Sequence, residues 1–361
     1  MTTHPQPQTL TAHQLFFDIQ ALDPLGLHAH NGSALRGMLY RAVAELVTGD
    51  RPGGRRMPDL RFVPDPAIQR LLATLDEDNP RGKDVPRPYV IEPPATPLPA
   101  LGGGAGAGGH ALAPGESFTF GITLFGDAME AFPILVMAMH HAQERGLGRF
   151  LPPSPQPLSQ RERGFSRGRF RLLRAFAQNP LTRTTQEFFV SGERMVMTPQ
   201  VCISHDDIVR QAELDAEPAS THLRLHLYTP LTMKSKGEVL RQLTFSVLIH
   251  RLIERLTQLS QTYGGTVLPC LPNPTDREAR NTLLRMADGV RLIHDNTRWA
   301  EVRGHSDRTR GSTNLSGLMG TADFEADDFA PFFQILRWGE IAHAGNNTVK
   351  GNGLFRMQVL G

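Results

Sequence analysis

The chain is poor in cysteine, in lysine and in long apolar runs, and these shortages exclude several classes of protein. Its two cysteines, Cys202 and Cys270, stand far apart in the sequence, so we expect neither a disulfide framework nor a cysteine-based zinc site. No segment approaches the roughly 20 uninterrupted apolar residues of a membrane-spanning helix, and residues 1–14 lack the apolar core of a secretion signal. We therefore expect a cytoplasmic protein that has no membrane partner.

What the chain does have is enough length and apolar content for two domains. With 361 residues, of which 40% are hydrophobic, two globular units can each bury a core. Two stretches of biased composition interrupt the first half, a proline-rich segment over residues 80–99 and a glycine run over residues 102–109. Because such stretches act as flexible connections, we expect a loop insertion at about residues 51–114 that carries no chemistry.

Arginine dominates the basic residues, since only four of the 38 Lys and Arg residues are lysines. The net charge is only +2, yet arginines cluster in a basic segment over residues 152–180 and again near residue 303. Arginines that alternate along a strand, or that mix with Gly and Ser in a loop, are typical of phosphate neutralisation. A solvated sheet edge would explain the first cluster equally well, and both interpretations remain open.

Strand and helix patterns occur twice in the same order. The first half predicts strands at 15–21 and 118–125, a helix at 33–47 and a second helix capped by Asp127. The second half predicts matching strands at 223–228 and 318–324, a helix at 238–263 and a second helix capped by Asp327.

This duplication predicts an α+β fold of two tandem ferredoxin-like domains, which are also called RRM-like. The βαββαβ order of each unit satisfies the right-handed crossover rule. We place the N-terminal domain at residues 1–215, with the insertion and the basic segment, and the C-terminal domain at residues 216–361.

A run rich in glycine and asparagine follows the last predicted helix and precedes a short apolar strand. It contains Gly345, Asn346, Asn347, Lys350, Gly351, Asn352 and Gly353. Glycine readily adopts positive φ, and backbone N–H groups in that conformation can cradle phosphate oxygens. In a P-loop or a dinucleotide-binding fingerprint the glycine loop lies between a strand and the helix that follows it, so the order here excludes both motifs. The run instead predicts a different anion partner.

Taken in order, these features resemble the CRISPR repeat-RNA processing endoribonucleases of the RAMP superfamily. The likeness is carried by Trp299 and the Arg- and Ser-rich stretch that follows, the strand at 317–324, the turn at 339–345 and the final Gly351-Asn352-Gly353. The first half adds the Gly-rich entry to a helix at 32–37. Two departures from the family pattern are Asn346-Asn347 and the middle Asn352, where members have a basic or small residue and a Leu or Phe.

The resemblance implies an endoribonuclease that needs neither a metal nor a cofactor. Its partner would be CRISPR repeat RNA, as a stem-loop or a single strand, and cleavage of the precursor by the 2′-hydroxyl would leave a 2′,3′-cyclic phosphate. Implied RNA contacts, besides the glycine-rich run, are Arg36, Lys234, Lys236, Arg303, His305 and Arg308. His343 would shape the glycine loop by hydrogen bonding. Other CRISPR effector subunits and a second copy of the chain, giving a homodimer, are further possible partners.

Such a reaction needs a base for the 2′-hydroxyl, an acid for the leaving 5′-oxygen and cations for the phosphorane oxygens. His28 and His30 precede the first helix, whose N–H groups favour an anion, and in an extended segment both side chains point to one side. Either histidine could be the acid or base, with Tyr40 assisting. An ordinary loop histidine and a core tyrosine are the alternative interpretations.

Two other functions stay open at this point. A non-catalytic subunit that binds repeat or guide RNA would not need His28 or His30. A metal-dependent phosphohydrolase built around His205, Asp206 and Asp207 would need further ligands on helices, and the sequence offers no convincing set. Arg251 and Arg255, four residues apart on the long helix, are expected to be solvated rather than bound to RNA.

Overall fold

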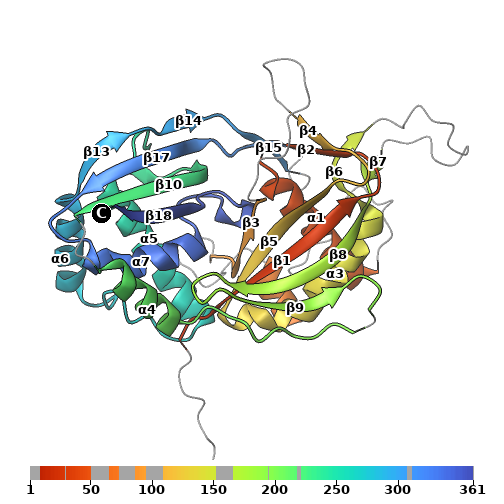
Figure 1. Cartoon of the computed structure of the whole chain (residues 1–361), viewed down its shortest axis with the longest axis horizontal. Helices are drawn as coiled ribbons and strands as arrows, with labels where there is room; N and C mark the ends of the chain where they lie inside the picture. Colours follow the sequence, from red (N-terminus) through yellow and green to blue (C-terminus); the bar gives the residue numbers. More distant parts are fainter. Residues whose placement is uncertain are drawn as a thin grey trace, which may run out of the picture.

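The computed structural model describes residues 9–28, 30–49, 65–72, 86–94, 109–151, 166–193, 195–217, 221–306 and 311–360. Most of the insertion expected at 51–114, the first part of the basic segment at 152–180, Arg308, and the side chains of His28 and His305 lie outside the described residues. The chain forms two units side by side, with the N-terminal unit at the right and the C-terminal unit at the left of Figure 1.

The N-terminal unit contains an antiparallel five-stranded sheet in the order β3-β5-β1-β8-β9. Its elements are β1 (Ala12–Ala21), α1 (Gly32–Thr48), β3 (Tyr89–Glu92), β5 (Ser117–Phe125), α3 (Phe132–Arg145), β8 (Phe170–Asn179) and β9 (Thr184–Val190). Helices α1 and α3 cover one face of this sheet (Figure 1). Along β1 buried and half-buried residues mostly alternate, as expected for a strand with one face on a core.

The C-terminal unit repeats this arrangement with a sheet in the order β13-β17-β10-β18. Its elements are β10 (His222–Leu231), α5 (Phe245–Tyr263), β13 (Arg291–Asp295), β14 (Arg298–Ala300), β17 (Gly317–Glu325), α7 (Ala330–Ala342) and β18 (Phe355–Leu360). The order equals β3-β5-β1-β8 of the first unit, strand for strand. The predicted tandem ferredoxin-like fold is therefore confirmed.

Four short strand pairs and three further helices extend the two units. The pairs are β2 (Leu25–His28) with β4 (Gly109–Leu112), β6 (Leu147–Leu151) with β7 (Ser166–Gly168), β11 (Lys234–Ser235) with β12 (Glu238–Val239), and β15 (Arg303–Ser306) with β16 (Gly311–Asn314). The helices are α2 (Pro66–Leu72), α4 (His205–Asp215) and α6 (Arg277–Asp288). None of the helices within the described ranges is long and apolar enough to cross a membrane.

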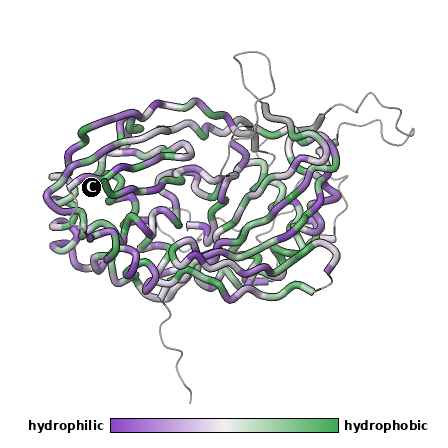
Figure 2. Tube along the Cα trace, viewed as in Figure 1, coloured by the Kyte–Doolittle hydropathy of each residue, from purple (hydrophilic) through white to green (hydrophobic). Residues whose placement is uncertain are grey.

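Two hydrophobic clusters form the interior, and the second of them joins the two units. It is built mainly from α5, α7 and the C-terminal sheet, but it includes Leu10, Ala12, Val90 and Phe125 of the first half. Apolar segments line the interior of both units in Figure 2. At the same contact Tyr263 donates its hydroxyl hydrogen to the Pro86 carbonyl, at 2.7 Å. The units therefore share an apolar interface.

Three predicted helix starts were wrong, each for a local reason. The long helix begins at Phe245 rather than at 238, because Lys236 and Gly237 adopt positive φ and form the turn of the β11–β12 hairpin. A 3-10 turn over Gly126–Ala131 contains Asp127, and α3 begins only after it. The N-cap residue of α7 is Phe329 and not Asp327, and Oδ1 of the neighbouring Asp328 accepts a hydrogen bond from the Ala330 N–H at 2.8 Å.

Candidate functional site

The start of α1 packs directly on the glycine-rich loop of the other unit. A Cβ atom at Gly32 would lie 1.8 Å from the carbonyl oxygen of Lys350, so a residue with a side chain could not occupy this position. On its other side the loop packs on β3, with Gly351 next to the Ile91 carbonyl. The loop thus lies where the two units meet.

The loop has the backbone that the sequence predicts. Gly345, Asn347, Gly351 and Gly353 have φ values of 72°, 60°, 79° and 74°. This is the left-handed region that glycine and asparagine tolerate best. A short 3-10 turn over Thr348–Lys350 connects its two halves.

The end of the loop is tied into the protein by hydrogen bonds, and RNA contact at Gly351, Asn352 and Gly353 stays a prediction. The N–H groups of Gly351 and Gly353 donate to the carbonyls of Thr348 and Pro230, at 2.8 and 3.1 Å. Asn352 is only 3% exposed, and its Nδ2 donates to the Leu315 carbonyl at 2.9 Å. These N–H donors are therefore already paired inside the protein, so they contribute little to a phosphate cradle.

Three polar loop residues reach the surface. Asn346 is exposed, while Asn347 and Lys350 are half-buried. The Asn346 N–H donates to the Thr232 carbonyl at 3.0 Å, which leaves its side-chain amide as the group that faces outward. Contacts with a ligand at this loop therefore depend on side chains more than on backbone N–H groups.

The β15–β16 hairpin of the second unit also reaches α1. A Cβ atom at Gly304 would lie 3.4 Å from Ser33 Oγ, in the first turn of the helix. The hairpin residue Arg303 is exposed, and His30, three residues before Ser33, is half-buried. The structure thus brings the predicted residues His30 and Arg303 toward one end of α1, close to Lys350.

Farther along α1, two arginines and two tyrosines form a second group. Arg36 Nε donates to Tyr89 Oη at 3.1 Å. Burial lowers the pKa of Arg87. Interactions with Tyr89 and Tyr40 raise this pKa, whereas the positive charge of the nearby Arg36 lowers it further. Two arginines this close to one another favour a bound anion.

The position of Tyr40 argues against the assisting role that the sequence suggested for it. A helical rise of about 1.5 Å per residue places Tyr40 about 12 Å along the axis from Gly32. It packs against the first hydrophobic cluster and interacts with Arg87. The assisting role of Tyr40 stays a prediction, and it would require the side chains of His30 and Tyr40 to reach toward each other along α1.

A buried contact between His343 and Glu92 fixes the base of the loop. His343 has φ 58° and is fully buried, and its Nε2 lies 3.3 Å from Glu92 Oε2. Burial would raise the pKa of Glu92, but His343 and Arg356 together with hydrogen bonding hold it below its usual value. Oε1 of Glu92 accepts from Thr123 Oγ1 at 2.7 Å. His343 thus holds the loop to the first unit, in line with the shaping role expected for it.

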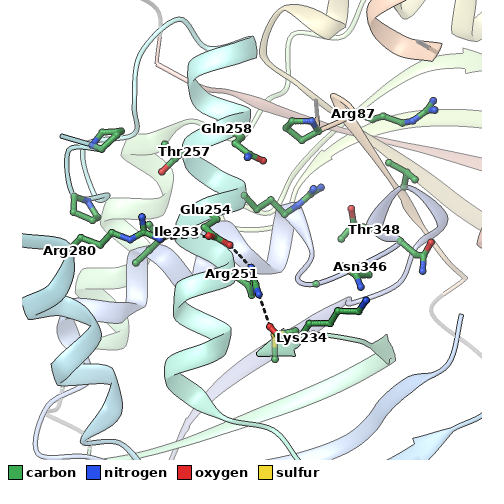
Figure 3. A pocket seen from close by; sticks show the side chains of 18 residues that line it. Arg87, Lys234, Arg251, Ile253, Glu254, Thr257, Gln258, Arg280, Asn346 and Thr348 are labelled. Atoms are coloured by element: carbon green, nitrogen blue, oxygen red, sulfur yellow. Dashed lines mark hydrogen bonds and ion pairs between the residues drawn. The ribbon is translucent and has the colours of Figure 1, made fainter. Parts of the chain in front are cut away.

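A pocket of about 750 Å³ opens between α5, the loop and the segment before β3. Figure 3 shows α5 with Glu254 and Gln258 on one side, and Asn346 and Thr348 of the loop opposite, with Arg87 contributed by the first unit. The basic residues that line it are Arg87, Lys234, Arg251, Arg255 and Arg280. Lys236 does not line it and is exposed in the hairpin turn.

Arg255 is not solvated, contrary to the expectation from the sequence. Its Nε donates to the Ala342 carbonyl at 2.9 Å, and its Nη2 is buried and has no hydrogen-bond partner. Burial lowers the pKa of Arg255 to about 10, so the side chain is still charged at neutral pH. Arg251, by contrast, is held at the surface by Glu254 and by the Lys234 carbonyl, at 2.7 and 2.6 Å (Figure 3).

Sequence reasoning missed Arg87 and Arg255 as well as Glu92. Arg87 and Glu92 flank the apolar run Tyr89-Val90-Ile91, which forms β3 inside a stretch that looked like a proline-rich linker. That short apolar run was the available signal. For Arg255 there was none, because an arginine on an amphipathic helix is usually solvated.

His205, Asp206 and Asp207 form a helix cap rather than a metal site. Ser204 Oγ accepts from the Asp207 N–H at 3.2 Å, and the Asp207 carboxylate accepts from the Ser204 N–H, which makes a capping box for α4. His205 Nδ1 accepts from Trp338 Nε1 at 3.2 Å. Among the described residues, no three His, Cys, Asp or Glu side chains are grouped as metal ligands would be.

Comparisons with known proteins agree with this architecture. Residues 10–201 match a family model described as an N-terminal domain (AF_1859_N), and residues 225–355 match the model of the CRISPR-associated endoribonuclease Cas6. The second match connects residues 225–355 to the family of CRISPR repeat-RNA processing proteins. Among curated proteins, no sequence matches it.

Two solved structures share the fold at low sequence identity. A product complex of a Cas6 from Thermus thermophilus covers 96% of this chain and 99% of its own, with 13% identity and a TM-score of 0.51. A chain of a partial Cas6-RT-Cas1–Cas2 complex covers 98% of this chain and 47% of its own, with 10% identity and a TM-score of 0.57.

Proposed function

We propose that the protein cleaves CRISPR repeat RNA without a metal ion, at the end of α1 where His30, Arg303 and Lys350 converge. The 2′-oxygen beside the scissile phosphate attacks the phosphorus and loses its proton, and the bond to the 5′-oxygen breaks as that oxygen takes up a proton. The products are a 2′,3′-cyclic phosphate and a 5′-hydroxyl. Cleavage would mature the precursor CRISPR RNA.

In this proposal His30 is the principal acid or base, because an unperturbed imidazole titrates near neutral pH. Arg303 and Lys350 would neutralise the phosphate oxygens, and the N-terminus of α1 adds a partial positive charge. His28 ends β2, one residue from the segment that leads into α1, so it remains the second candidate for proton transfer.

The observation that carries the proposal is the contact between Gly32 and the Lys350 carbonyl. It joins the helix start that follows His30 to a loop from the far end of the chain. Two parts of the sequence that share no local interaction are thereby held at one place, on a surface lined with cations. Such convergence is typical of a site.

The test is cleavage of the cognate repeat RNA in EDTA, with and without a 2′-deoxy substitution at the cut site. We expect cleavage to persist in EDTA and the 2′-deoxy RNA to bind and stay intact. Loss of activity in EDTA that Mg²⁺ or Mn²⁺ restores would contradict metal independence. Mapping the 3′ end of the upstream product checks for the cyclic phosphate.

A non-catalytic subunit that holds repeat or guide RNA is the second candidate, and the basic pocket beside α5 favours it. Such a protein would bind the repeat tightly and leave it intact. If the protein binds the unmodified repeat RNA, which has all its 2′-hydroxyls, and leaves it uncut, this second function is the right one. In either case repeat RNA is the partner, and other CRISPR proteins are further proposed partners.

A further inference from the structure

We propose that the pocket between α5 and the glycine-rich loop binds one nucleotide of a single strand, with its phosphate on Arg255 and Lys234 and its base against the proline wall. The inference rests on the proposed function, because that nucleotide would belong to the repeat RNA. It adds a binding site beside the cleavage site, because loop residues up to Val349 line the pocket while no residue of α1 is among the described residues that line it.

The charge of the pocket points to an anion. Among the described residues that line it, five are basic and only Glu254 is acidic. Glu254 is already engaged, because it lies 2.7 Å from Arg251 and 3.7 Å from Arg280. Among the described residues, no carboxylate pairs with Arg255 or with Lys234. A ligand with negative charge would complete this set.

Arg255 makes the strongest case for a phosphate. A buried guanidinium without a carboxylate is costly, and proteins seldom retain one unless a partner or ligand compensates it. The Ala342 carbonyl satisfies only Nε, and Nη2 has no partner. Because Nη2 is buried, a phosphate oxygen in the pocket would accept from Nη1, and its negative charge would compensate the guanidinium.

The size and walls of the pocket point to a nucleotide rather than to phosphate alone. A volume of about 750 Å³ is in the range of pockets that hold small organic ligands and is much larger than one phosphate needs. Pro86, Pro272 and Pro274 give it an apolar wall, and the amides of Asn346 and Gln258 can hydrogen-bond to a base edge. Figure 3 shows Asn346 and Gln258 on opposite sides of the space.

The experiment measures binding of AMP, UMP and inorganic phosphate to the full chain by calorimetry, and binding of the repeat RNA by filter retention. We expect both nucleotides to bind more tightly than inorganic phosphate. Arg255→Met should weaken nucleotide binding by about tenfold or more, as for loss of a hydrogen bond to a charged group. Lys234→Met is the second variant, because this exposed side chain can be truncated without a risk to folding.

Arg285→Met is the matched control. Arg285 is exposed on α6, bonds only to Thr282 and does not line the pocket, so its loss should leave nucleotide affinity unchanged. The affinities of the variants for repeat RNA should follow the same order as their affinities for nucleotides. The slope of log affinity against log salt concentration should become flatter by roughly 0.7 for each lost phosphate contact to a single strand.

Two results would overturn the proposal. One is wild-type nucleotide affinity in both Arg255→Met and Lys234→Met, and the other is inorganic phosphate binding as tightly as AMP and UMP. The proposed function fails separately. A wild-type protein that cleaves repeat RNA but does not bind nucleotides would refute only the pocket, whereas one that binds nucleotides but neither binds nor cleaves the repeat would refute the function.

Discussion

At the scale of single residues, His30 is the position on which cleavage should depend most. His30→Ala should lower the cleavage rate by about 10²- to 10⁴-fold, as for loss of a general acid or base, while repeat binding stays near normal. Single-turnover cleavage at saturating protein measures the chemical step. His294→Ala is the control, because His294 is exposed on the edge strand β13. If only His28→Ala slows cleavage, proton transfer belongs to His28.

Glu92 makes stability depend on acid pH. Although burial acts in the opposite direction, His343 and Arg356 hold its pKa in the folded chain below the ordinary value of 4.5. The unfolded chain therefore binds the proton more readily, so this contribution is complete above about pH 4.5 and is lost as the pH falls through the folded pKa. Urea unfolding between pH 3 and 7 measures it.

Glu92→Gln should lower the free energy of unfolding by about 1–3 kcal/mol at neutral pH, because a charge-assisted contact inside the protein is lost. The same substitution should also make the free energy of unfolding fall less steeply as the pH decreases below 4.5. Glu193→Gln, at an exposed position, should change neither quantity. An unchanged acid slope in Glu92→Gln would show that other carboxylates account for the decline.

For single residues, the sequence predicted backbone conformation better than it predicted side-chain contacts. Positive φ at Gly345, Gly351 and Gly353 followed from residue type, because few other residues adopt it without strain. That Asn352 is buried against Leu315 did not follow, since a long-range partner leaves no local pattern. The buried role of Arg255 was hidden for the same reason.

At the scale of elements, the contact between α1 and the loop can be broken by one methyl group. Gly32→Ala would place Cβ 1.8 Å from the Lys350 carbonyl, so α1 and the loop must separate. We expect a loss of about 1–3 kcal/mol in stability, as for overpacking, together with a large loss of cleavage. Thermal unfolding and a cleavage assay on the same samples measure both.

Gly37→Ala is the matched control within the same helix. Its Cβ would meet only the tip of the Arg41 side chain at 3.4 Å, so the usual helix preference for alanine should stabilise the protein by about 0.5–1 kcal/mol. Cleavage should be unchanged. Equal behaviour of Gly32→Ala and Gly37→Ala would refute the importance of the α1–loop contact.

The elements themselves were largely predictable, because apolar spacing distinguishes strands from helices. The errors fell at boundaries. The start of α5 was predicted seven residues too early, because the sequence of residues 238–244 is compatible with either a helix or a hairpin. The small pairs β2–β4 and β15–β16 were not foreseen, because four-residue strands carry too little periodicity.

At the scale of the whole molecule, the shared second core predicts that the two units unfold together. Phe125 lies on a strand of the first sheet, is fully buried and belongs to the cluster of the second unit. Calorimetry should therefore show one transition with equal calorimetric and van't Hoff enthalpies. Phe125→Ala should lower stability by about 3–5 kcal/mol and keep a single transition. Two resolved transitions in the wild type would contradict the shared core.

The contact of Gly32 with Lys350 also governs when the protein can become active during its synthesis. The ribosome makes α1 early and the loop more than 300 residues later, yet neither forms the site alone. A nascent or prematurely terminated chain that stops before residue 350 would keep the whole first sheet and still lack the lysine, the loop and the anchor provided by β18. Unfinished copies would therefore be unable to cut RNA, so translation itself delays activity until nearly all of this sequence has been made.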